Sequence, residues 1–114
     1  MEIQEQLEAV RAYRGTVRVT IGTDTVDAHV LGTQHTPEDK GIPEHIDASF
    51  RLDAKPEQML NIQQQVIDDL LMQNFCTVSV LARTRSSWYL RETIELVKNE
   101  QGAYMWHIHA RIYF

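Results

Sequence analysis

The C-terminal segment, residues 103–114, carries the side chains of this chain that are best suited to chemistry. Its polar and apolar residues alternate, and successive side chains of a strand point to opposite faces. The even-numbered residues from Tyr104 to Phe114 therefore form an apolar face. The opposite face carries two imidazoles, a guanidinium and a phenol, at His107, His109, Arg111 and Tyr113. We expect any binding or reaction on this strand to involve that row.

Two histidines at this spacing suit a metal ion, because residues two apart on a strand lie about 6.5–7 Å apart on one face. A third protein ligand is needed, and the expected strand pairing places Glu95 beside His107. Glu95, His107 and His109 would suit Zn, Mn or Fe(II). Without a metal, Glu95 and His107 could act as a general acid–base pair. The motif is common by chance, so we favour an ion pair of Glu95 with His107 on a solvated face and expect no cofactor.

Arginine and tyrosine side chains extend the same face. Both residue types are enriched at protein interfaces and tend to be hot spots there. They also resemble the surfaces that bind single-stranded nucleic acids by stacking and phosphate contacts. The net charge of −5 favours a protein partner or a second copy of the chain over nucleic acid. The candidate binding residues are Arg83, Tyr89, Arg91, His107, His109, Arg111 and Tyr113.

Hydrophobic periodicity predicts the elements that must position this face. Helices are expected at residues 2–14 and 56–74, with Pro56 in the first turn of the second. The second helix is expected to bury a stripe of Met59, Ile62, Val66, Ile67, Leu70 and Leu71. Strands are expected at residues 16–21, 25–31, 45–53, 76–84, 88–98 and 103–114. Residues 32–44, with glycines, prolines and charges, are expected to form one long loop.

The parity of the last three strands constrains their pairing. Their even-numbered residues face the core, so opposed residues must have numbers that sum to an even number. A three-residue loop ending at Gly102 then places Glu95 opposite His107, Arg91 opposite Arg111, and Tyr89 opposite Tyr113. A turn at residues 85–87 places Thr77 opposite Glu95, and a turn near Thr23 places Ile21 opposite Val26. A slip of two residues would change the partners but not the faces.

The predicted fold is α+β, in a single domain of residues 1–114. It consists of a predominantly antiparallel sheet of about six strands in the order α-βββ-α-βββ, with both helices packed on one face. Short similarities between the two halves would allow an αβββ duplication, although chance explains them more simply.

Several classes of protein do not fit the composition. No apolar run approaches the roughly 20 residues of a membrane span, and the N-terminus lacks the pattern of a secretory signal. Cys76 is the only cysteine and is expected to be a buried core thiol. These features favour a cytoplasmic protein without a membrane partner.

The leading functional hypothesis is a non-enzymatic interaction or assembly protein. It would self-associate or dock a protein partner through the outer face of its last three strands. No nucleophile elbow or glycine-rich phosphate loop occurs in the sequence. The alternatives are a small enzyme or ligand-binding domain with a pocket around Glu95, His107 and His109, and a single-stranded nucleic-acid binder using the arginines and tyrosines.

Overall fold

The computed structural model describes residues 16–92 and 94–114, and this part of the chain contains seven strands and one helix. Their bounds are β1 Thr16–Ile21, β2 Asp24–Thr36, β3 His45–Asp53, α2 Pro56–Gln73, β4 Thr77–Leu81, β5 Arg85–Leu90, β6 Glu95–Lys98 and β7 Tyr104–Tyr113. Each overlaps a segment for which the sequence predicts that type of element. The predicted helix at residues 2–14 lies outside the described residues.

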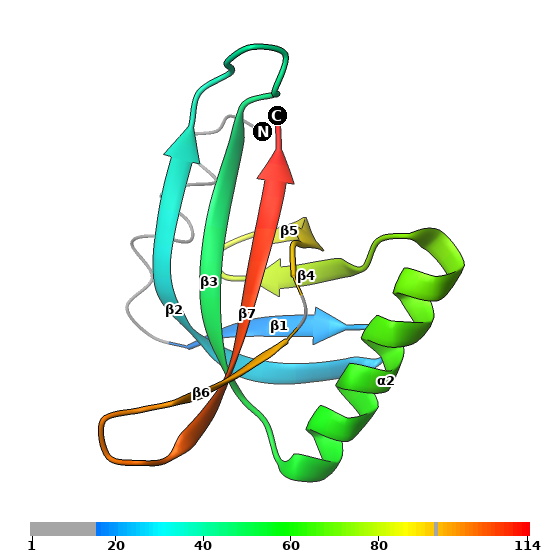
Figure 1. Ribbon diagram of the computed structural model, residues 1–114, viewed down its shortest axis with the longest axis vertical. Helices are drawn as coiled ribbons and strands as arrows, with labels where there is room; N and C mark the ends of the chain where they lie inside the picture. The colour runs from blue at the N-terminus through cyan, green and yellow to red at the C-terminus, as the bar shows by residue number, and fades with distance from the viewer. Residues whose placement is uncertain (1–15, 93) are drawn as a thin grey trace.

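The strands form a closed antiparallel barrel, in which β2, β3 and β7 run side by side (Figure 1). Neighbouring strands follow the order β3-β2-β1-β4-β5-β7, and β3 pairs again with β7. Two contacts therefore join the halves of the chain: β1 pairs with β4, and β3 pairs with β7. The short strand β6 pairs with the first half of β7.

The expected α+β fold, with an open sheet and two helices on one face, is wrong. The described chain is a six-strand antiparallel barrel with one helix. Alternation shows which side of each strand is apolar, and it is satisfied equally by a sheet face and by a barrel interior. Closure depends on sheet twist and on the long-range pairing of β3 with β7. The arrangement expected for a duplicated αβββ unit, with both helices on one side of the sheet, is therefore wrong as well.

The residues predicted to face inward fill the barrel. Val19, Phe50, Val78 and Ile108 are all fully buried, as expected from their parity. Phe50 and Trp88 are the largest buried side chains, and their rings meet edge to face at 6.4 Å. The interior is a packed core, so it leaves the outer surface for function.

The prediction of a turn at residues 85–87 is wrong, because these residues begin β5 and Ser86 is buried. Ser86 lies inside β5, where its Oγ accepts a 2.7 Å hydrogen bond from the indole of Trp88. The same hydroxyl donates to the carbonyl of Val80 at 3.5 Å. The chain reverses earlier, between Leu81 and Arg85. The parity of the strands allowed a three-residue turn there, but these partners satisfy the hydroxyl inside the core.

The prediction of a core thiol is confirmed, because Cys76 is completely buried. Burial raises the pKa of this thiol to about 11, and the charge of Asp69 and a hydrogen bond to it act in the same direction.

Helix α2 runs past the ends of β1 and β2 (Figure 1). Gln65 attaches it to the turn between these strands. Its Oε1 accepts a 2.7 Å hydrogen bond from the amide of Thr23, and its Nε2 donates to Asp24 Oδ2 at 2.6 Å. Asn74 adopts a left-handed conformation with a φ of 63° and ends the helix.

The buried stripe of α2 is narrower than the sequence predicts. Met59, Ile62 and Val66 are buried and Leu70 is partly buried, as expected. Ile67 and Leu71 were also expected in the core, but they are 50% and 79% exposed. A helix at the end of strands contacts the barrel along a narrower line than a helix lying on a sheet face.

The hairpin between β6 and β7 has the predicted register. Glu95 lies opposite His107, and Gly102 has the positive φ, 85°, that the three-residue loop requires. The other predicted registers are wrong, each by an even number of residues. Tyr89 pairs with Arg111 and with Thr77, and Ile21 pairs with Asp24. The even slips leave the predicted faces of β1, β4, β5 and the middle of β7 intact. The inward prediction is wrong for Leu96, Tyr104 and Phe114, which are 49%, 62% and 41% exposed.

Two departures from the predicted strands shape the outer surface. The expected strand at residues 88–98 is interrupted between β5 and β6. The expected loop at residues 32–44 begins later, because β2 continues to Thr36 and pairs with β3 along that length, so only residues 37–44 connect the two strands. A bulge at Leu31 lets β2 bend there, since Val30 lies opposite Phe50 and Gly32 lies opposite Ser49.

Candidate functional site on the outer face of the barrel

The pairing of β3 with β7 builds the centre of the outer surface. It places Asp47 opposite Arg111, Ser49 opposite His109, and Arg51 opposite His107. Asp47 and Ser49 were not candidates from the sequence. Their odd positions on an alternating strand are compatible with the outer face, but only the long-range pairing with β7 identifies their partners.

Asp47 is the charged centre of this surface. Its carboxylate accepts hydrogen bonds from Arg111 Nε at 2.7 Å and Arg111 Nη2 at 3.1 Å. Arg91 Nη1 lies 3.6 Å from the same carboxylate, and His45 Nε2 lies 3.7 Å from it. Burial alone would raise the pKa of Asp47, but the hydrogen bonds and positive charges prevail and lower it. The hydrogen bond to Asp47 raises the pKa of Arg111.

His109 connects three strands. Its Nδ1 lies 2.9 Å from the hydroxyl of Ser49 on β3, and its Nε2 lies 3.3 Å from Glu95 Oε2 on β6. Glu95 is thus opposite His107 in the ladder, but its carboxylate contacts His109. The sequence predicted this carboxylate–imidazole contact at His107, and the structure has it two residues further along β7, at His109.

Aromatic rings adjoin Arg111 on the outside of the barrel. Tyr113 lies 5.7 Å from its guanidinium and 6.3 Å from the ring of Tyr89. Tyr89 in turn meets Phe75 edge to face at 5.7 Å. We call Phe75, Tyr89 and Tyr113 the aromatic surface. Each of its members is 43–45% exposed.

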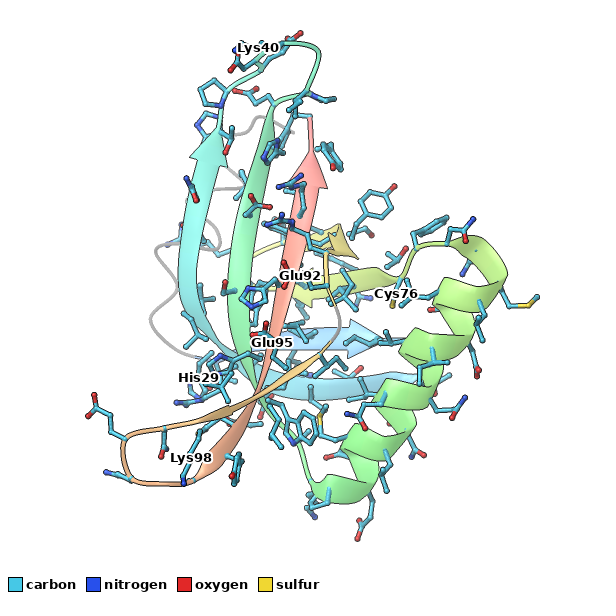
Figure 2. The ribbon with its side chains drawn as sticks, viewed as in Figure 1. His29, Lys40, Cys76, Glu92, Glu95 and Lys98 are labelled. Atoms are coloured by element: carbon cyan, nitrogen blue, oxygen red, sulfur yellow. The ribbon has the colours of Figure 1, made fainter. Side chains whose placement is uncertain are left out.

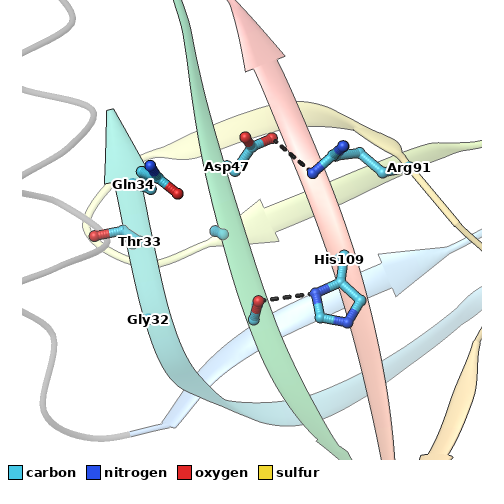
Figure 3. A pocket seen from close by; sticks show the side chains of 8 residues that line it. Gly32, Thr33, Gln34, Asp47, Arg91 and His109 are labelled. Carbon is cyan, nitrogen blue, oxygen red and sulfur yellow. Dashed lines mark hydrogen bonds and ion pairs between the residues drawn. The ribbon is translucent and has the colours of Figure 1, made fainter. Parts of the chain in front are cut away.

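A pocket of about 320 Å³ opens beside these residues (Figure 3). Arg91, Asp47, Ser49 and His109 line one side of it. The other side is β2 after its bulge, where a side chain at Gly32 would meet no atom within 4 Å. The glycine and the bulge therefore keep space open beside the imidazole of His109.

The structure brings together most, but not all, of the candidate binding residues. Four of them, Tyr89, Arg91, Arg111 and Tyr113, form one connected set through Asp47 and the ring contacts. His109 joins this set through the 2.9 Å hydrogen bond from the amide of Arg91 to its carbonyl. His107 lies on the same face of β7, two residues from His109. Arg83 lies in the turn between β4 and β5, at the far end of β5 from Tyr89. It is not part of this set.

The fold and the site define a small closed antiparallel barrel with a polar and aromatic outer face. No family model, curated protein or solved structure matches the chain. Among the described residues, no helix has the length and apolar character needed to cross a bilayer.

Proposed function

We propose that this protein is a non-enzymatic interaction or assembly protein. It self-associates or docks a protein partner through the aromatic surface together with Arg91 and Arg111. The observation that carries the proposal is the row of contacting rings at Phe75, Tyr89 and Tyr113 on the outside of a filled barrel. These rings are not needed to fill the core, and a group of exposed aromatic side chains is typical of a binding surface.

The ordering of Arg111 supports the same proposal. Two hydrogen bonds to Asp47 and the ring of Tyr113 hold its guanidinium in one position. A partner that binds an ordered side chain loses less conformational entropy on association. Ordered arginine beside exposed tyrosine is the composition of interface hot spots.

The charges favour a protein over single-stranded nucleic acid as the partner. Both arginines of the surface lie within ion-pair distance of Asp47, and Glu95 lies next to His109. The local charge is therefore mixed, whereas a phosphate-binding surface needs uncompensated positive charge. We take a second copy of the chain as the first partner to test.

Light scattering after size exclusion, over a range of protein concentrations, tests this proposal. We expect the mass of the wild type to rise above the 13.2 kDa of one chain with concentration. Tyr89→Ser and Arg91→Glu should remain monomeric. Tyr104→Ser is the matched control, because Tyr104 is 62% exposed but lies at the opposite end of β7 from Tyr113.

The result that would reject a second copy as the partner is a strict monomer at every concentration. Association that persists unchanged in both Tyr89→Ser and Arg91→Glu would instead reject the aromatic surface as the place of contact. A loss of association in Tyr104→Ser alone would move the interface to the β6–β7 hairpin.

A further inference from the structure

Three side chains with metal-binding atoms converge beside β7, at Glu92, Glu95 and His109. One potential ligand atom from each lies within 4.8 Å of the other two. Figure 2 shows Glu92 and Glu95 close to this strand. We propose that they bind a divalent transition-metal ion through one imidazole and two carboxylates. This donor set suits Zn²⁺, Mn²⁺ and Fe²⁺, and the site is independent of the aromatic surface.

The interruption between β5 and β6 creates this arrangement. Leu90 lies opposite Ala110, and Glu95 lies opposite His107. Between these pairs, the β5–β6 chain has four residues, 91–94, whereas β7 has only two, 108 and 109. The amide of Arg91 donates a 2.9 Å hydrogen bond to the carbonyl of His109. Glu92 therefore directly follows a residue that is bonded to His109, and its side chain lies near the imidazole.

Ser49 orients the imidazole for this role. Its hydroxyl lies 2.9 Å from Nδ1 of His109, so Nε2 is the nitrogen that faces Glu95. In a metal complex, Nδ1–H would donate to the serine oxygen while Nε2 binds the ion. Metal-binding histidines commonly make a hydrogen bond of this kind through the nitrogen that does not bind metal.

The surroundings leave room for a further ligand. His109 also lines the pocket of about 320 Å³ that continues toward Gly32. Three protein ligands beside an open space are the arrangement in which water or a small ligand completes the coordination of the ion. A cation would also offset the repulsion between two neighbouring carboxylates that a single imidazole can only partly relieve.

Other histidines provide matched controls. His35 Nε2 lies 2.8 Å from Glu44, and His29 Nε2 lies 2.9 Å from Asp53. Among residues 16–92 and 94–114, no third histidine, cysteine or carboxylate ligand joins either pair. If any exposed imidazole–carboxylate pair sufficed for binding, these pairs would bind as well as the proposed site.

The test is a titration of the untagged, chelator-treated full chain with Zn²⁺ by competition calorimetry, and with Co²⁺ by absorption spectroscopy. We expect one ion per chain. His109→Gln, Glu92→Gln and Glu95→Gln should each weaken binding by at least about tenfold, and Ser49→Ala by about tenfold through loss of the orienting hydrogen bond. His35→Gln and His107→Gln should bind as the wild type does. Circular dichroism confirms that each variant is folded.

Absence of stoichiometric binding in the wild type would overturn the proposal. So would equal losses in His35→Gln and His109→Gln, because they would indicate non-specific imidazole binding. A loss in His107→Gln without one in Glu92→Gln would also overturn it, in favour of the ligand set Glu95, His107 and His109. Association through the aromatic surface is measured separately, so either proposal can fail alone.

Discussion

Arg111 on β7 donates two hydrogen bonds to the carboxylate of Asp47 on β3, at 2.7 and 3.1 Å. The two residues are 64 positions apart and lie opposite each other where β3 and β7 meet. Both side chains are about one-fifth exposed, so solvent screens this pair only in part. The pair therefore links the two strands that close the barrel to the candidate functional site on its outer face.

Asp47→Asn is expected to lower the free energy of unfolding by about 1–3 kcal/mol at neutral pH, because it leaves a partly buried guanidinium with a weaker acceptor. Urea denaturation measures this change. Asp27→Asn is the control, since Asp27 is exposed on β2. An equal loss in the two variants would contradict a special role for the pair of Asp47 with Arg111.

The stability difference between the wild type and Asp47→Asn should depend on pH. The pKa of Asp47 is lowered in the folded protein from its ordinary value of 3.8. The unfolded chain therefore takes up the proton first as pH falls, and the stabilisation decreases. It is complete above about pH 5 and is lost as pH falls through the folded-state pKa. Urea denaturation between pH 3 and 7 would contradict this if the difference were constant.

Alanine substitutions of two phenylalanines, one inside the barrel and one at its surface, test whether the barrel interior is the hydrophobic core. Phe50 is fully buried inside the barrel, whereas Phe114 is 41% exposed. Phe50→Ala should cost about 3–5 kcal/mol of folding free energy through lost burial and a new cavity. Phe114→Ala should cost less than about 1 kcal/mol. Chemical denaturation compares them, and similar costs would argue against a filled interior at Phe50.

Alanine substitutions at three glycines distinguish the stability cost of backbone strain from that of a steric clash. Gly22 has a φ of +62°, and an added Cβ would overlap the side chain of Gln65. Gly41 has a φ of +84° in open space, and Gly32 has neither constraint. Thermal denaturation should rank the alanine variants with Gly22→Ala least stable and Gly41→Ala about 1–2 kcal/mol below the wild type. Gly32→Ala should lie within about 0.5 kcal/mol of it. A Gly22→Ala protein as stable as Gly32→Ala would contradict the close contact with Gln65.

The thiol of Cys76 should react only after unfolding. Its pKa is raised from 9.0 to about 11, so roughly one thiol in a thousand is ionised at pH 8 in the folded protein. Burial blocks access as well. Reaction with Ellman's reagent should be slow for the native chain and fast in concentrated urea, with glutathione as the reagent control. Rapid reaction of the native protein would show that this part of the core opens readily.

Local information predicted the elements well. Alternation identified the inward faces because a strand has a period of two, and a pairing slip by an even number of residues leaves that period intact. The hairpin ending at Gly102 also had a predictable register, because a short loop with a left-handed glycine allows few geometries. Pro56 marked the start of α2 for a similarly local reason.

The site was predictable only in part. The polar row of β7 and its aromatic neighbours were visible as alternation, and the structure joins Tyr89, Arg91, His109, Arg111 and Tyr113. Asp47 and Ser49 were missed because they reach the row through non-local pairing. Glu92 was missed because a continuous strand was expected where β5 ends at Leu90 and β6 begins only at Glu95. Arg83 was included because a strand was expected to continue to residue 84, whereas β4 ends at Leu81.

The amino-acid sequence by itself determined which side of each strand is apolar, where α2 begins, and which polar groups β7 presents. These properties depend on residues a few positions apart, within the reach of backbone geometry and side-chain periodicity. Only the tertiary structure decided that β3 meets β7, and hence that Asp47 holds Arg111 while Ser49 orients His109. Many pairings satisfy the same alternation, and sheet twist together with core packing selects the one that closes the barrel.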